Sequence, residues 1–291
     1  MRDILALVMM STEEILEKHF PKGQWNINEP PAGLSKQAYI ADNGKKKVFI
    51  KFDVKTPALK RLSELGLTPL VVYDGTNEER PYIIQEFSEG SYPDRNWFFN
   101  NLQQLAMFIK KYQQDELLKD LLSKGKMQSY EEHIRQELAV LENSLRDFHF
   151  DVFETDHVKT GINLLKKKSR DLKPVPLVPT HADPNSKNFL LTNSGLSMID
   201  WDDIILSDPM KDVGLMLWWN IPKDKWLEFF KFYGQELDEE KIYWWIARAS
   251  LSIAIWFAKR VDRENAKFFI DDFLLAIQGK DNSQIYINNP N

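Results

Sequence analysis

The chain has 291 residues, which allows one large domain or two smaller ones. Hydrophobic residues make up 43% of it and aromatic residues 12%, so a sizeable buried core is expected and global disorder is excluded. The 38 lysines and arginines against 43 aspartates and glutamates give a net charge of −5, which lacks the basic excess of a general nucleic-acid binder. The absence of cysteine excludes disulfide frameworks, zinc ribbons and thiol catalysis.

Two apolar stretches indicate whether the protein is secreted or inserted in a membrane. The run from Ile4 to Met10 has no small-residue cleavage site and leads directly into a helical pattern, which indicates a first helix rather than a signal peptide. The stretch from Ile242 to Ala258 is the most apolar in the chain but carries Arg248 near its middle, which favours a core helix over a membrane span. These features predict a cytoplasmic protein that binds neither membrane nor nucleic acid.

Short β-like runs separated by turns fill residues 1–90. The Asp42-Asn43-Gly44 break between two apolar runs predicts a hairpin, and further strands are expected over Leu70 to Tyr73 and Tyr82 to Phe87. One short helix lies among them, with Thr56 as its cap, Pro57 in its first turn and Gly66 at its end.

After Gly90 the apolar spacing becomes mostly helical. The helices we expect are Asn96 to Gln113, Tyr130 to Phe148, Asp156 to Lys168, Lys223 to Tyr233, Asp238 to Arg260 and Asn265 to Ile277. The sequence therefore predicts a two-lobed α+β protein. A small, mostly antiparallel β lobe spans residues 1–90, and a larger α-helical lobe spans residues 91–291.

One β-like island interrupts the helical half. Two apolar runs, Phe189 to Leu191 and Leu196 to Ile199, flank a turn that ends in glycine, which predicts a β-hairpin. Because a hairpin brings its outer ends together, Asn188 and Asp200 are expected to be neighbours. Asp183 lies on the loop just before the first strand.

These residue types suit phosphoryl transfer, which depends on positioning the reactants and neutralising phosphate charge. Carboxylate and amide oxygens are ligands suited to Mg²⁺, and a separate aspartate can accept the proton of an acceptor hydroxyl. The spacing from His181 through Asp183 to Asn188 is that of a kinase catalytic loop. Asp200 follows the hairpin where a metal-binding aspartate would stand.

The block from Thr180 to Asp212 resembles the aminoglycoside phosphotransferase and choline kinase-like superfamily, which has a protein-kinase-like fold. The motifs that carry the resemblance are His181-Ala182-Asp183 with Asn188, Ile199-Asp200-Trp201, and Asp208-Pro209-Met210-Lys211-Asp212. The resemblance implies Asp183 as the catalytic base and His181 as a support of the loop. It implies Asn188 and Asp200 as the Mg²⁺ ligands, and Asp212 as a brace.

The N-terminal lobe offers matching parts. Gly33-Leu34-Ser35 resembles the family's nucleotide loop, in which backbone N–H groups and the Ser35 hydroxyl meet phosphates. Lys51 ends its strand as the family's phosphate-binding lysine does. The interlobe hinge is expected near Gln85, so the backbone of Glu86 and Ser88 is expected to contact adenine.

The sequence also departs from the family. Kinase-like folds pair the lysine with a glutamate on the next helix, but the single acid there, Glu64, is expected to point outward toward Lys60. Asp53, two residues from Lys51 and on the same strand face, is the other candidate partner. Ala182 replaces the usual glycine. These departures leave open a catalytically weak, pseudokinase-like binding module.

Three further aspartates, Asp202, Asp203 and Asp208, lie in this region. Asp208 is expected to cap the helix that follows it. Asp202 and Asp203 are expected to be solvated acids, the alternative being a contact of one of them with a second metal.

We therefore expect a Mg²⁺-dependent transfer of the γ-phosphate of ATP or GTP to a hydroxyl of a small cationic molecule, with an aminoglycoside-type acceptor favoured over choline or ethanolamine. Acidic residues that could form a rim for a cation are Asp238, Glu239, Glu240, Asp262, Glu264, Asp271 and Asp272. Aromatic rings that could face a quaternary ammonium are Trp218, Trp219, Trp226, Trp244, Trp245 and Trp256. Solvated helix faces and core packing are the alternative interpretations of the two sets.

Overall fold

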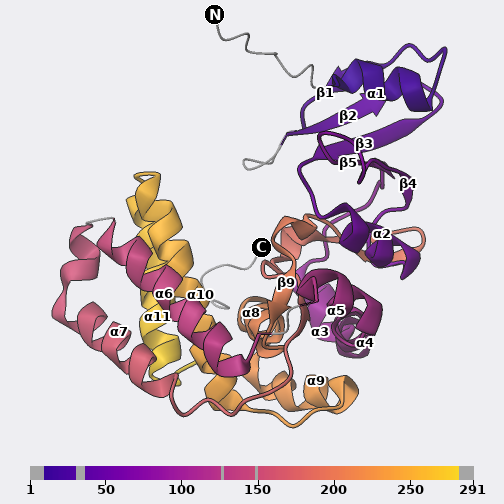
Figure 1. Ribbon diagram of the computed structural model, residues 1–291. Helices are drawn as coiled ribbons and strands as arrows, with labels where there is room; N and C mark the ends of the chain where they lie inside the picture. The colour runs from indigo at the N-terminus through magenta and orange to yellow at the C-terminus, as the bar shows by residue number, and fades with distance from the viewer. Residues whose placement is uncertain (1–9, 31–36, 126–127, 148–149, 282–291) are drawn as a thin grey trace, which may run out of the picture. The chain divides into compact units, whose positions relative to one another are not determined.

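The structure is a computed structural model that describes residues 10–30, 37–125, 128–147 and 150–281. Its contacts divide the chain into two compact units (Figure 1). The first comprises Met1–Ser91 with Leu190–Asp202, and the second comprises Tyr92–Phe189 with Asp203–Asn291. Residues 190–202, which the sequence placed in the second lobe, thus have their contacts mainly with the first unit.

A five-stranded antiparallel sheet forms the first unit, in the order β1-β2-β3-β5-β4. In chain order, the first unit contains α1 (Thr12–His19), β1 (Asn26–Asn28), β2 (Ala38–Asp42), β3 (Lys47–Phe52), α2 (Thr56–Glu64), β4 (Val71–Asp74) and β5 (Tyr82–Glu86). The predicted hairpin is present as β7 (Phe189–Thr192) and β8 (Gly195–Met198), followed by the 3-10 turn η3 (Trp201–Asp203). The β2–β3 hairpin and strands β4 and β5 confirm the predicted strands.

Strand β3 places Lys51 on the face of the sheet that points away from the core of this unit. Val48, Ile50 and Phe52 alternate along the strand and are all buried. They pack in one cluster with Ile15 and Leu16 of α1, which lies on this sheet (Figure 1). Because successive strand residues face opposite sides, Lys51 lies on the other face of the sheet.

The short helix of the first unit ends as predicted but begins differently. Pro57 lies in the first turn of α2, and Gly66, with φ +68°, follows the helix end in a conformation that glycine adopts without strain. The cap position is Lys55, without a side-chain bond. The hydroxyl of Thr56, which was expected to cap, bonds the hydroxyl of Thr76 instead.

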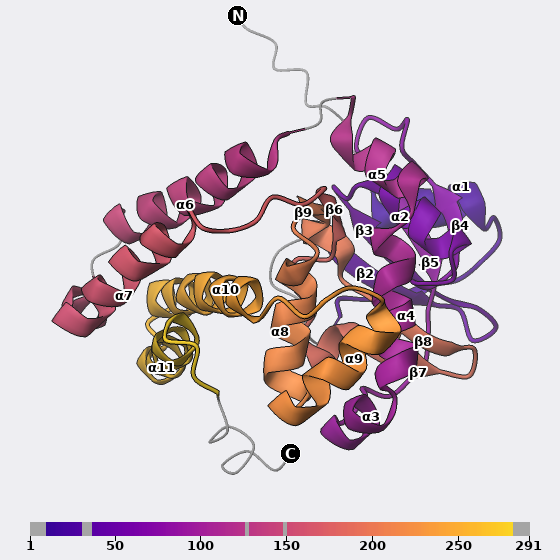
Figure 2. The ribbon, with the colours of Figure 1, turned by 90° about the horizontal axis from the view of Figure 1, so that it is seen from below.

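The second unit is mainly helical, with a two-stranded sheet of β6 (Val178–Thr180) and β9 (Ile205–Ser207). Its helices are α3 (Arg95–Asn100), α4 (Leu102–Gln113), α5 (Glu116–Ser123), α6 (Tyr130–Arg146), α7 (Asp156–Lys168), α8 (Met210–Asn220), α9 (Trp226–Tyr233), α10 (Glu239–Lys259) and α11 (Arg263–Ile277). Helices α10 and α11 lie side by side, and α10 also packs on α8 (Figure 2). An antiparallel-sheet unit and a larger helical unit confirm the predicted two-lobed α+β fold.

Helix α10 is a core helix that carries the buried charge of Arg248, as predicted. Arg248 is 8% exposed, and its Nε lies 2.8 Å from Oε2 of Glu137 on α6. The second carboxylate oxygen of Glu137 accepts from Nζ of Lys211 on α8 at 2.7 Å. The ion pairs therefore join three helices. Within the described residues, no helix has both the length and the apolarity needed to cross a membrane.

Candidate active site

The loop between β6 and β7 carries Asp183 and Asn188, and hydrogen bonds within the loop fix both side chains. Nδ2 of Asn188 donates to the backbone oxygen of Asp183 at 2.8 Å and to its Oδ2 at 3.1 Å. Nδ2 of Asn185 donates to the same Oδ2 at 2.9 Å. Asp183 is exposed and Asn188 is 8% exposed. The amide nitrogen of Asn188 is thus used inside the loop, which leaves its Oδ1 as the atom suited to a cation.

Asp212, on the first turn of α8, anchors the start of this loop. Its buried carboxylate accepts the backbone N–H of His181 at 2.7 Å, the backbone N–H of Ala182 at 2.9 Å and the hydroxyl of Tyr112 at 2.8 Å. Burial raises the pKa of Asp212, while the imidazole of His181 and these hydrogen bonds oppose the rise. The brace that the resemblance implied is therefore present, and Tyr112 is a member of it that no sequence pattern indicated.

The imidazole of His181 contributes to the loop from within the core. The residue is fully buried, and Nδ1 accepts the backbone N–H of Asp183 at 3.3 Å. This contact lies inside the loop, in keeping with the supporting role implied by the resemblance.

Ala182 adopts φ +72°, in the left-handed region where a Cβ atom is unfavourable. We expect Ala182→Gly to raise the free energy of unfolding by about 1 kcal/mol, because glycine relieves this strain while the backbone bond to Asp212 stays. Urea unfolding measures the change. The matched control is Ala139→Gly at an exposed position of α6, where the same replacement should destabilise by about 1 kcal/mol. A loss of stability in Ala182→Gly would contradict the strain.

In the first unit, Nζ of Lys51 contacts two carboxylates. It lies 2.8 Å from Oδ1 of Asp200 and 2.7 Å from Oδ1 of Asp202. The Lys51 side chain is 13% exposed, the Asp200 side chain 50% and the Asp202 side chain 9%. Burial acts to lower the pKa of Lys51, but the two carboxylates outweigh it and hold the pKa above its ordinary value. Lys51 therefore carries a firmly held positive charge.

The partners proposed for Lys51 from the sequence are engaged elsewhere. Asp53 has φ +56°, so the strand alternation that placed it beside Lys51 has already ended, and its carboxylate pairs with Arg80. Glu64 is half exposed and pairs with Arg61 at 3.3 Å.

Two further interpretations of charged side chains were wrong. Lys60, expected to pair with Glu64, lies 3.7 Å from Asp74 instead. Asp202, expected to be solvated, is nearly buried against Lys51. Its neighbour Asp203 is exposed, as expected.

Asp208 acts beside a helix start, one position before the cap. Pro209 is the cap residue of α8, and Oδ1 of Asp208 accepts the N–H of Met210 at 2.8 Å. Its Oδ2 accepts the hydroxyl of Tyr130 at 2.8 Å and lies 3.4 Å from Nζ of Lys241. The expected cap is thus replaced by a buried bond to the first helical residue.

The structure describes some of the remaining predicted site residues but not all of them. Ser35 lies outside the described residues. Glu86 ends β5, and its N–H donates to the Leu70 carbonyl at 2.8 Å, so this N–H is taken. Ser88 lies in the segment that follows β5. Asn188 belongs to the second unit and Asp200 to the first, so their expected proximity stays a prediction.

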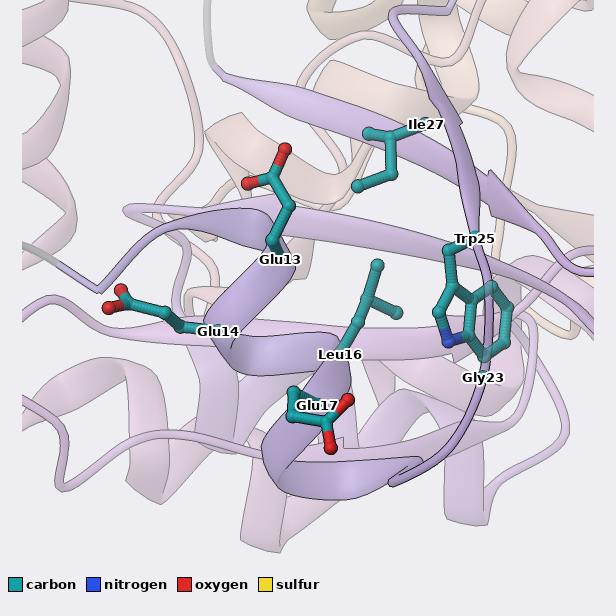
Figure 3. A pocket seen from close by; sticks show the side chains of 7 residues that line it. All are labelled: Glu13, Glu14, Leu16, Glu17, Gly23, Trp25 and Ile27. Carbon is teal, nitrogen blue, oxygen red and sulfur yellow. The ribbon is translucent and has the colours of Figure 1, made fainter.

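The first unit also contains a hollow of about 330 Å³ between α1 and the segment that leads into β1 (Figure 3). Its lining residues are Glu13, Glu14, Leu16, Glu17, Gly23, Trp25 and Ile27. None of the described residues that were predicted for phosphoryl transfer lines it.

The donors predicted for Mg²⁺ are of the right chemical type. Asp200 offers a half-exposed carboxylate, and Asn188 offers an amide oxygen. Within the described residues, no group of three or more histidine, cysteine, aspartate or glutamate side chains is arranged to hold a metal ion. Mg²⁺ is commonly held by one or two protein oxygens together with phosphates and water, so each of these oxygens is a chemically suitable ligand.

Most of the tryptophans considered for a cation pack in the core. Trp218, Trp226, Trp244 and Trp245 are at most 2% exposed. The face of Trp256 is covered by the guanidinium of Arg260, whose carbon lies 3.6 Å from the ring centroid.

Several of the acids have local structural roles. Asp238 and Asp262 accept backbone N–H groups at the starts of α10 and α11. Glu239 bonds Lys223 at 2.6 Å, and Asp272 is buried. Exposed acids of the set include Glu240, Glu264 and Asp271.

Asp272 of α11 is a buried carboxyl bonded by two indoles. Its Oδ2 accepts Nε1 of Trp218 at 3.1 Å and Nε1 of Trp219 at 3.4 Å. Burial raises its pKa from 3.8 to about 6. Between these values the folded state binds a proton that the unfolded chain has released, so stability falls as the pH rises.

We expect Asp272→Asn to remove that slope and to make the protein more stable at neutral pH, by up to about 3 kcal/mol. The asparagine oxygen still accepts from the indoles and carries no charge into the core. Urea unfolding at several pH values between about 4 and 8 measures the effect. Asp271→Asn, an exposed neighbour on the same helix, should leave the slope in place. Equal slopes in wild type and Asp272→Asn would contradict the prediction.

Comparison with known proteins identifies the class. The two units form the two-lobed α+β architecture of kinase-like phosphotransferases, and residues 56–245 match the phosphotransferase enzyme family. Because the match spans more than half of the chain, the chain belongs to this family. The family is one of phosphotransferases, enzymes that transfer phosphoryl groups.

Solved structures share the fold at low sequence identity. A thermostable mutant of aminoglycoside phosphotransferase APH(4)-Ia, crystallised with ADP and hygromycin B, has a TM-score of 0.68 at 15% identity, over 93% of this chain and 99% of that chain. Choline kinase LicA from Streptococcus pneumoniae has a TM-score of 0.65 at 16% identity, over 92% and 96%. The GDP and kanamycin complex of APH(2")-IIia has a TM-score of 0.61 at 15% identity, over 95% and 98%.

Proposed function

We propose that this phosphotransferase transfers the γ-phosphoryl group of ATP or GTP to a hydroxyl of a small cationic acceptor, with Asp183 as the catalytic base. The carboxylate of Asp183 takes the proton of the acceptor hydroxyl. The hydroxyl oxygen of the acceptor then bonds the γ-phosphorus, and the nucleoside diphosphate leaves. The loop from His181 to Asn188 carries this proposal, because it holds an exposed carboxylate in fixed orientation on a buried anchor.

Lys51 and residues 86–88 are the proposed nucleotide contacts of the first unit. The Lys51 ammonium binds the α- and β-phosphates. Because the Glu86 N–H is taken by Leu70, the adenine contacts we propose are the Glu86 carbonyl and the Ser88 N–H. Ser35 is proposed, from the motif alone, to meet the phosphates. Structural relatives crystallised with ADP, AMP or GDP support a nucleotide co-substrate without choosing the base.

Asn188 and Asp200 would hold Mg²⁺ through an amide oxygen and a carboxylate. When bound, the ion neutralises charge on the phosphates. Asp200 is well suited because its side chain is half exposed, so its carboxylate can exchange the contact with Lys51 for a contact with the ion.

An aminoglycoside-type acceptor is the favoured class. Two structural relatives were crystallised with hygromycin B and with kanamycin, and exposed acids on the helical unit suit a polycation. Choline is the second candidate, because a choline kinase shares the fold. The burial of most tryptophans reduces the aromatic surface that a quaternary ammonium would need.

The test is release of nucleoside diphosphate with Mg²⁺, ATP or GTP, and a panel of aminoglycosides, choline, ethanolamine and amino alcohols. We expect release that depends on one acceptor class. Nucleotide binding with no release across the panel would favour the pseudokinase-like alternative, and the absence of nucleotide binding would overturn the kinase proposal.

A further inference from the structure

Lys51 needs a fixed partner to act on phosphates. Its side chain has four rotatable carbon bonds, so a free ammonium would sample many positions and lose entropy on meeting a nucleotide. In kinase-like folds a helix glutamate restrains the lysine. Here the acid of α2, Glu64, is half exposed and bonded to Arg61. Glu64 therefore does not restrain Lys51 in this structure.

The segment after β8 supplies two carboxylates. Trp201 is 2% exposed, and its Nε1 donates to the Met198 carbonyl at 2.9 Å, which fixes the turn. Asp200 and Asp202 flank this tryptophan, and both reach Nζ of Lys51. One anchored turn therefore presents both acids to the lysine.

The two carboxylates differ in exposure, and this difference separates their roles. The Asp200 side chain is 50% exposed, and the backbone of this residue has φ +61°. The Asp202 side chain is 9% exposed, and its Oδ1 lies 2.7 Å from Nζ of Lys51. A nearly buried ion pair is less screened by water than an exposed one and costs more to break. Asp202 is therefore the lasting contact, and Asp200 is the one that can exchange.

We infer that Asp202 positions Lys51 for the nucleotide phosphates, taking the part that a helix glutamate plays in other kinase-like folds. The inference rests on the proposed function, since it assumes that Lys51 binds phosphates. Asp202 is a positioning residue that acts through Lys51. Asp200 then remains available as the proposed metal ligand.

The experiment is a double-mutant cycle on ADP binding, measured by calorimetry with EDTA so that no metal contributes. The variants are Asp202→Asn, Lys51→Met, the double variant, Asp202→Glu and the exposed neighbour Asp203→Asn. Thermal melts establish that each variant is folded. We expect Asp202→Asn to weaken ADP binding about 3- to 100-fold, the range of coupling between contacting residues. In turnover, KM for the nucleotide should rise more than kcat falls.

The inference is decided by comparing the effect of Asp202→Asn in wild type with its effect in the Lys51→Met variant. We expect Asp202→Asn to have no further effect when Lys51 is already methionine, Asp202→Glu to restore part of the binding, and Asp203→Asn to match wild type. Unchanged binding in Asp202→Asn would overturn the inference. So would a loss that persists with Lys51→Met, or one that arises only with Mg²⁺, because each would place Asp202 at something other than Lys51. A wild-type protein that binds no ADP would overturn the proposed function and this inference with it.

Discussion

Asp183→Asn is expected to lower kcat by about 10²–10⁴-fold, the usual contribution of a general base. Asparagine keeps an oxygen that can accept from Asn185 and Asn188, so the loop and the fold should persist. It cannot take the acceptor proton. Steady-state kinetics with the acceptor identified in the panel measure the loss, and ADP binding should stay at the wild-type value.

The control for Asp183→Asn is Asp171→Asn, the same change at an exposed position of the second unit. It should turn over at the wild-type rate. If Asp183→Asn retained full kcat while folded, Asp183 would not be the base and the proposed mechanism would be wrong.

Asp212→Ala is expected to cost about 3–5 kcal/mol of unfolding free energy, because three buried donors lose their acceptor at once. These donors are the backbone N–H groups of His181 and Ala182 and the hydroxyl of Tyr112. The left-handed backbone at Ala182 would also lose its support, so turnover should fall in any fraction that folds. Urea unfolding and hydrogen exchange at the His181 and Ala182 amides measure the two effects.

Tyr112→Phe is the graded control for this brace. It removes one of the three hydrogen bonds and leaves the carboxylate in place, so a loss of about 1 kcal/mol with near-normal turnover is expected. Wild-type stability in Asp212→Ala would show that the carboxylate does not anchor the loop.

Much of the fold follows from local patterns. Strict alternation in β3 and the Asp42-Asn43-Gly44 turn predict the central hairpin, and 3.6-residue spacing predicts α6, α7, α10 and α11. Helix α8 was missed because nine of its eleven residues are buried, which erases the amphipathic period. Strands β1, β6 and β9 have three residues each, too few to show a pattern.

The site divides in the same way. Asp183, Asn188 and Asp200 could be proposed from the sequence because motif spacing is local, and their roles stay predictions. The partner of Lys51 could not, because Asp202 lies 151 residues away in the chain and only tertiary contacts bring it there. The error at Asp53 arose from extending the strand period past Phe52, where a positive φ ends it. Tyr112 carried no sequence signal, since a buried tyrosine in a helix resembles any core residue.

The most direct test of the central claim follows the γ-phosphoryl group itself. Wild-type protein and Asp183→Asn are incubated with Mg²⁺, γ-labelled ATP or GTP and each acceptor of the panel, and the products are separated. The account predicts that label moves to one acceptor class, one phosphoryl group for each nucleoside diphosphate formed, and that Asp183→Asn abolishes the transfer. Label that stays on bound nucleotide, or that appears only as inorganic phosphate for every acceptor tested, would contradict it.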